Sequence, residues 1–130
     1  MLVASGIAER DGKVLICKRP GNVPFSGLWE FPSVEISGEE TLEDALAGDF
    51  FERLSTNLCA VEGAFAFDSR CIRDTRYYAF FVQISGKLGP LCGYDGAKWV
   101  SLNKLRKFRL MPDCVTIIKS LQKKTFFSRN

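Results

Sequence analysis

The stretch LWEFPSVEISGEETLEDALAGDFFERLS, residues 28–55, determines the fold that the sequence predicts. It opens with an aromatic and proline-containing segment, passes through a turn, and continues as a helical pattern from Thr41 to about Leu54. Thr41 with Asp44 three residues later fits a capping box, and the acidic residues of 39–44 suit the positive end of a helix dipole. We therefore expect an amphipathic helix behind a short extended lead-in.

On a helical wheel at about 100° per residue, an apolar arc of this helix adjoins a charged one. The apolar arc contains Leu46, Ala47, Phe50, Phe51 and Leu54. Asp49 and Glu52 lie beside it, three residues apart, so their carboxylates could reach one hard cation such as Mg²⁺. Asp49 and Arg53 also have the spacing of an ordinary i,i+4 ion pair. The helix pattern alone favours the ordinary ion pair.

Strand-like runs flank this segment on both sides. Residues 3–9 and 13–17 surround Asp11-Gly12, a dipeptide typical of tight hairpin turns with positive φ. The remaining expected elements are strands at 29–31, 60–68, 75–84 and 96–100 and short helices at 102–107 and 115–123. This order predicts a mixed α/β or α+β sandwich and not a regular βαβ repeat. Of the strand aromatics, Phe80 and Phe81 are expected in the core.

Length and composition limit the possible classes of protein. The chain has 130 residues, which suits one domain over 1–130, with a tail that frays at about 125–130. Five widely spaced Cys and no His argue against zinc and against a Ser-His-Asp triad, and indicate buried or half-buried thiols in a reducing cytoplasm. No apolar run approaches the roughly 20 residues that span a bilayer. We expect a cytoplasmic protein without a membrane partner.

The charge balance bears on possible ligands. A formal net charge of +3 is compatible with polyphosphate ligands, but it is far from the signature of a protein that binds duplex nucleic acid. The basic run from Lys104 to Arg109 is interpreted as a solvated helix edge.

Several short motifs outside the helix agree with one known pattern. They are the basic pair Lys18-Arg19, Leu28–Pro32, Gly38–Thr41, Lys98–Leu102 and Leu110–Asp113. Together with the helix they resemble the Nudix family, in particular its MutT-like members, whose box reads G-x5-E-x7-R-E-U-x-E-E-x-G-U with U an aliphatic residue. The resemblance covers nearly the whole chain. It implies a Nudix α/β/α sandwich with a mixed β-sheet, formed by one domain.

The box itself matches only in part. Glu40 and Glu52 stand at box glutamate positions, and Asp49 is a shorter substitute at another. The departures are Val34 for Gly, Gly48 for Arg, Arg53 for the last Glu and Ser55 for the closing Gly. A guanidinium at position 53 competes with metal ions for the neighbouring carboxylates, because it pairs well with them and does not lose its proton. The sequence therefore predicts a degenerate Nudix box with weakened metal binding.

The resemblance also implies roles for individual residues. In the family, glutamates of the box hold divalent metal ions that act on a diphosphate group. Carried over to this chain, Glu40, Asp49 and Glu52 would bind Mg²⁺ or Mn²⁺, and Asp49 and Glu52 would be the catalytic residues. The candidate substrate-binding residues are Arg19, Arg53 and Asp113. Asp113 would contact a base, and the competing role for it is to cap the last helix.

Two functions remain open at this point. The first is a MutT-like nucleotide pyrophosphohydrolase that cleaves a nucleoside diphosphate linkage, with turnover impaired by the degenerate box. The second is a catalytically inactive Nudix-fold module that binds a nucleotide or a protein partner. On both hypotheses the expected small ligand is a nucleotide or another nucleoside diphosphate derivative.

Overall fold

The chain begins with the hairpin that Asp11-Gly12 predicts. In the computed structural model, β1 (Leu2–Arg10) and β2 (Lys13–Lys18) pair in antiparallel fashion. Asp11 and Gly12 have φ of 55° and 78°, as a two-residue turn matched to the twist of paired strands requires. The structure describes residues 1–124, so the fraying expected at about 125–130 lies outside the described residues.

The remaining predicted elements are all present, with ends that differ by up to three residues. They are β3 (Trp29–Glu30), α1 (Leu42–Leu54), β5 (Asn57–Asp68), β6 (Arg76–Ser85), β7 (Gly96–Ser101), the 3₁₀ helix η1 (Leu102–Lys107) and α2 (Pro112–Lys124). The structure adds one short strand, β4 (Ser33–Glu35). Strand β4 was not predicted, because three residues behind a proline are too few to show alternation. Among the described residues, no helix combines the length and the apolar character needed to cross a membrane.

Strand β1 lies at the centre of a seven-stranded mixed sheet. The main order is β3-β2-β1-β6-β5, while β4 also pairs with β1 and β7 with β2. The β1–β6 pair is parallel, from Leu2 opposite Arg76 to Ala8 opposite Val82, and the other pairs are antiparallel. The sheet therefore brings residues 76–82 beside the N-terminal strand.

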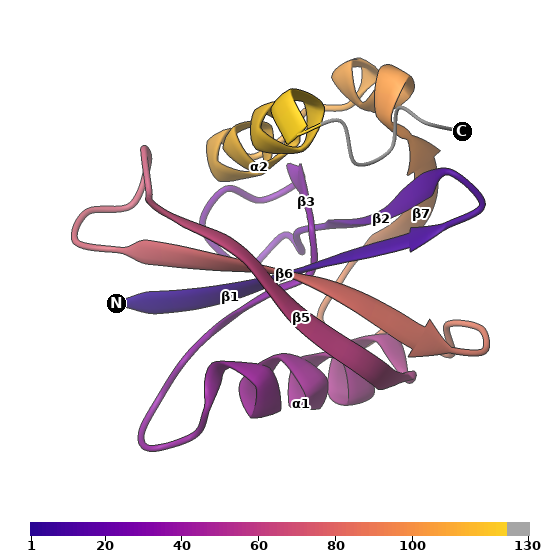
Figure 1. Ribbon diagram of the computed structural model, residues 1–130, viewed down its shortest axis with the longest axis horizontal. Coiled ribbons are helices and arrows are strands. Elements are labelled where there is room, and N and C mark those ends of the chain that lie inside the picture. Colours follow the sequence, from indigo (N-terminus) through magenta and orange to yellow (C-terminus); the bar gives the residue numbers. More distant parts are fainter. Residues whose placement is uncertain (125–130) are drawn as a thin grey trace.

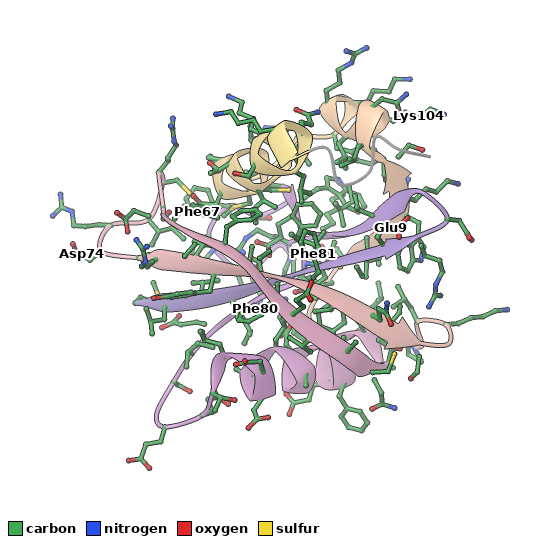
Figure 2. The ribbon with its side chains drawn as sticks, in the orientation of Figure 1. Glu9, Phe67, Asp74, Phe80, Phe81 and Lys104 are labelled. Carbon is green, nitrogen blue, oxygen red and sulfur yellow. The ribbon has the colours of Figure 1, made fainter. Side chains whose placement is uncertain are left out.

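Two hydrophobic layers lie on either side of the sheet, with α1 over one face and α2 and η1 over the other (Figure 1). Successive strand residues alternate between the layers, as the pleat requires. Phe80 packs in the α1 layer, and Phe81 packs against the α2 layer (Figure 2). The predicted α/β/α sandwich is confirmed. Phe80 is a core residue as expected, whereas Phe81 is only partly buried.

Helix α1 begins as predicted but is rotated relative to the predicted apolar arc. Thr41 caps it, because its Oγ1 accepts a hydrogen bond of 3.0 Å from the N–H of Asp44. The prediction that Phe51 packs with the core is wrong, since its side chain is 62% exposed. Asp49 instead faces the sheet and is buried. A carboxylate thus occupies an inward position that a core-packing helix usually fills with an apolar side chain.

The five cysteines are free thiols. Cys17 and Cys114 are buried and Cys71 is half-buried, as the composition predicts. The same expectation is wrong for Cys59 and Cys92, which are exposed. Cys59 lies on the outer strand β5 and Cys92 in the loop between β6 and β7, positions that the spacing of cysteines does not reveal.

Gly48, in the middle of α1, gives a test of local helix stability. A Cβ at this position meets nothing within 4 Å, so Gly48→Ala should raise the free energy of unfolding by roughly 0.5–1 kcal/mol through helix propensity. Gly89→Ala is the matched control, because its Cβ would lie 2.6 Å from the Cβ of Ser55 and should destabilise the protein. Urea unfolding measures both; stabilisation by both substitutions would contradict the packing described.

Candidate functional site around Asp49 and Arg53

The inward-facing Asp49 forms a buried polar cluster with Arg53 and Tyr94. Its Oδ1 accepts a hydrogen bond of 3.2 Å from Nη1 of Arg53, and its Oδ2 accepts one of 3.3 Å from the hydroxyl of Tyr94. Asp49 and Tyr94 are 6% and 5% exposed. Both carboxylate oxygens of Asp49 are therefore already hydrogen-bonded within the protein.

Arg53 connects α1 with two other segments. Its Nη1 donates to the carbonyl of Ser33 at 3.4 Å, and its Nη2 donates to the carbonyl of Gly93 at 2.9 Å. The guanidinium carbon lies 3.5 Å from the centre of the Tyr94 ring, which is a cation–π contact. Arg53 thus joins the helix to β4 and to the loop between β6 and β7, and the i,i+4 pair that the helix pattern favoured is confirmed.

The electrostatics of Asp49 follow from this geometry. Burial raises the pKa of the Asp49 carboxyl, while the charge of Arg53 and the hydrogen bonds from Arg53 and Tyr94 lower it. The guanidinium therefore supplies the compensation that a buried carboxylate requires.

A second buried carboxylate, that of Glu30, was not among the sequence-based candidates. It is 4% exposed, and its Oε2 accepts a hydrogen bond of 3.0 Å from Nη1 of Arg19, whose Nε donates to the carbonyl of Pro24 at 2.8 Å. Burial raises the pKa of Glu30 to about 7, against the lowering effects of Arg19 and Arg53. The position of Glu30 between Trp29 and Phe31 is the signal that could have identified it, because neighbouring strand residues face opposite layers.

The three candidate metal ligands are not gathered into one site. Glu40 is exposed and accepts a hydrogen bond of 3.4 Å from the N–H of Ser37, and Glu52 is exposed on α1. Asp49 is bound to Arg53 and Tyr94. Within residues 1–124, no three His, Cys, Asp or Glu residues form a group that could hold a metal ion. Glu40, Asp49 and Glu52 are thus not gathered around one point, and their binding of Mg²⁺ or Mn²⁺ stays a prediction.

Asp113 lies in the other layer and does not cap α2 in the way that the sequence suggests. It stands inside the first turn of the helix, which begins at Pro112, and is 1% exposed. Its carboxylate accepts from the Ser69 hydroxyl at 2.8 Å, the Arg70 N–H at 3.1 Å and the Cys71 thiol at 3.2 Å. Asp113 therefore holds the loop between β5 and β6, and a contact with a base remains a prediction.

The fold is a mixed sheet between two helical layers (Figure 1), and an acidic loop leads into α1. This is the class of α/β/α sandwich domains that the sequence predicts. The family model described as the NUDIX domain matches residues 3–120. This chain belongs to the NUDIX family.

One protein is similar to part of this sequence, and two solved structures are similar to its fold. A CTP pyrophosphohydrolase of Escherichia coli is 38% identical over 52 residues, which is 40% of this chain and only 38% of that protein. A solved chain from a study of MutT from Aliivibrio salmonicida and Vibrio cholerae has a similar fold, with a TM-score of 0.78 and 20% identity. The match covers 94% of this chain and 96% of that chain. The NUDIX domain of Shewanella oneidensis NrtR, solved with ADP-ribose, also has a TM-score of 0.78, with 21% identity over 96% and 88% of the two chains.

Removing the Arg53 guanidinium should destabilise the folded protein. Arg53→Met leaves Asp49 as a buried carboxylate without its cation, so we expect a loss of roughly 1–3 kcal/mol in the free energy of unfolding, between the values for exposed and buried pairs. Adding Asp49→Asn should restore part of the loss, because the unpaired charge is then removed. Arg76→Met, which breaks the exposed pair with Asp68, should change little. Equal losses for Arg53→Met and Arg76→Met in denaturant titrations would contradict this role.

Glu30 should make stability depend on pH. Its pKa is about 7 in the folded protein, against an ordinary value of 4.5, so the folded state binds this proton more tightly than the unfolded chain does. The free energy of unfolding should therefore fall as pH rises from about 4.5 to about 7. Glu30→Gln should flatten this fall in urea titrations. Arg19→Met should extend it to higher pH, because the charge of Arg19 lowers the pKa of Glu30. An unchanged slope in Glu30→Gln would rule out the effect.

Proposed function

We propose that this chain is a MutT-like nucleotide pyrophosphohydrolase with weak turnover, acting on the diphosphate linkage of a nucleoside derivative. The observation that carries the proposal is the pair between Asp49 and Arg53 inside a NUDIX fold. The fold and the lead-in strand are those of the family, whereas a fixed cation binds the carboxylate that would otherwise be available to a metal ion.

Family resemblance supports Glu40, Asp49 and Glu52 as ligands of Mg²⁺ or Mn²⁺, with Asp49 and Glu52 as the catalytic residues. The hydrogen bonds of Asp49 limit its capacity to bind a metal ion. Asp49 would have to leave both Arg53 and Tyr94 to bind a metal ion, and these contacts lie at 3.2 and 3.3 Å. Because the guanidinium keeps its charge at any physiological pH, this competition is permanent. Weak metal binding and slow hydrolysis follow.

A nucleotide or nucleoside diphosphate derivative is the ligand that the relatives favour. One relative is named for CTP, and one similar fold was solved with ADP-ribose. Arg19 and Arg53 are the proposed cations for phosphate oxygens. Each uses part of its guanidinium for contacts within the protein and keeps further N–H donors, since a guanidinium carries five. Asp113 is the proposed contact to the base.

The second candidate function is a module that binds a nucleotide or a protein partner without turnover. The contacts of Arg53 favour it, because they make the cluster complete without a metal ion. We also propose the cytoplasm as the location of the protein. Its five free thiols support this proposal, because thiols stay reduced in that compartment. We propose neither duplex nucleic acid nor a membrane as a partner.

Phosphate release distinguishes these two functions. Purified protein with Mg²⁺ or Mn²⁺ and a panel of nucleoside triphosphates and diphosphate conjugates should release phosphate or pyrophosphate slowly. Glu52→Gln should abolish that release if Glu52 is catalytic, and calorimetry should show that nucleotide binding persists. Exposed Glu35→Gln, outside the proposed metal ligands, is the matched control. Release that survives Glu52→Gln would overturn its catalytic role, and nucleotide binding without any release would favour the module.

Reversal of two of the four box departures tests the effect of Arg53 directly. Arg53→Glu together with Gly48→Arg should raise both metal affinity and the rate of hydrolysis, because a third carboxylate replaces the competing cation. Gly48 has open space around its Cβ position, so a longer side chain fits there. The variant is used at a temperature where its urea transition shows it folded, because it lacks the cation that compensates Asp49. Calorimetry of the folded variant with Mn²⁺ that shows no gain over wild type would mean that this face of α1 is not a metal site.

A further inference from the structure

Opposite faces of this molecule carry opposite charge. Residues 33–54, which form β4, a loop and α1, contain seven Asp and Glu and one cation, Arg53, which is paired with the buried Asp49. Residues 96–124 contain eight Lys and Arg and one acidic residue, Asp113, which is buried. Since α1 and α2 cover opposite faces of the sheet (Figure 1), the acidic and basic surfaces point away from each other. A charge asymmetry of this kind orients charged partners.

Two adjoining grooves of about 490 and 560 Å³ run along α2 on the basic side. Their volumes lie within the range of about 300–1,000 Å³ that is typical of binding pockets. Both are lined by Leu110, Val115 and Lys119. We call them together the basic groove. Its apolar floor includes Leu110 and Val115, and its exposed cations are Arg70, Arg106, Lys119 and Lys123. Lys104 extends the positive charge along the outside of η1 (Figure 2).

Within the described part of the chain, the side chains of the four groove cations form no ion pair. The three ion pairs among residues 1–124 involve other residues. The groove thus presents unpaired positive charge around an apolar floor, which suits a ligand with negative charge around an apolar anchor.

The outer face of α1 has that chemistry. Phe51 is 62% exposed, although a surface helix of this kind normally turns such a side chain inward. At 100° per residue, Asp44 lies next to Phe51 on the wheel, Glu43 and Glu52 flank it, and small Ala47 stands one turn before it. Glu43, Asp44 and Glu52 are exposed. We call this surface, formed by Glu43, Asp44, Ala47, Phe51 and Glu52, the acidic face.

We propose that the acidic face of one copy of this chain binds the basic groove of a second copy. The Phe51 side chain would pack against the apolar floor of the groove. The carboxylates around Phe51 would form ion pairs with Lys119 and Lys123. A phosphodiester chain could neutralise the same cations, but it would leave both the floor and Phe51 in contact with water. Because the two surfaces lie on opposite sides of the sheet, the contact is head-to-tail and leaves one free surface at each end.

Sedimentation velocity of the intact protein tests the proposal. At an ionic strength of about 0.01 M the Debye length is about 30 Å, so charges on two copies attract each other with little screening. Under these conditions the average mass should rise above the 14.6 kDa of the monomer as protein concentration increases. It should return to that of the monomer at about 1 M salt. Phe51→Ser alone, and Lys119→Glu with Lys123→Glu, should each give monomers at low salt. All three residues are exposed, so these variants should fold.

The decisive measurement mixes the two variants. Each lacks a different surface, so an equimolar mixture should form a 1:1 dimer that neither variant forms alone. This dimer should grow no further, because the surface left free at each end is the mutated one. Phe25→Ser, and Lys13→Glu with Lys87→Glu, make the same chemical changes at exposed residues elsewhere and should associate like wild type.

Three outcomes would overturn the proposal, and none of them depends on hydrolysis. They are a wild type that stays monomeric at low salt, control variants that lose association, and a mixture without a 1:1 dimer. A monomeric wild type that binds a fluorescent oligothymidylate, with the binding lost in the Lys119 and Lys123 variant, would assign the groove to a polyanion instead.

Discussion

The guanidinium of Arg53 is the contact on which the interior of this domain depends. It bonds a carboxylate of α1, a carbonyl at the start of β4 and a carbonyl in the loop between β6 and β7, and it covers the ring of Tyr94. Asp49 and Glu30 are both buried, and two buried carboxylates without cations would cost several kcal/mol each. Arg53 and Arg19 provide those cations. The position of α1 against the sheet therefore rests on charge compensation as well as on apolar packing.

This arrangement bears on the degenerate box that the sequence predicts. On the resemblance, positions 48 and 53 would hold an Arg and a Glu, whereas this chain has Gly48 and Arg53. Position 48 faces outward, with open space at its Cβ, and position 53 points toward β4 and Tyr94. The helix therefore carries a cation on its inner side, next to Asp49, and none at position 48. The buried carboxylate of Asp49 is balanced by this cation of the protein itself.

Local patterns predicted the parts of the structure that local physics determines. The Asp11-Gly12 turn, the Thr41 cap and the Asp49–Arg53 pair each depend on residues at most four apart, and each is confirmed. The sequence could not reveal that Tyr94 completes the cluster, because a loop that is distant along the chain supplies it.

Where the predictions were wrong, tertiary contacts had overridden a local pattern. Phe51 belongs to the apolar arc by periodicity, yet Asp49 takes the inward position because the contacts of Arg53 and Tyr94 compensate its burial. Asp113 precedes the predicted start of α2, but Pro112 begins the helix earlier and the loop at residues 69–71 takes up the carboxylate.

The parallel pairing of β1 with β6 has a consequence for how the chain matures during synthesis. Residues 2–8 form the middle of the sheet, but their partners are residues 76–82. During synthesis the hairpin of β1 and β2 can form early, while one edge of β1 lacks hydrogen-bond partners until residues 76–82 have left the ribosome. An unpaired strand edge attracts other strands. The nascent hairpin is therefore exposed to association with other strands until β6 has been made.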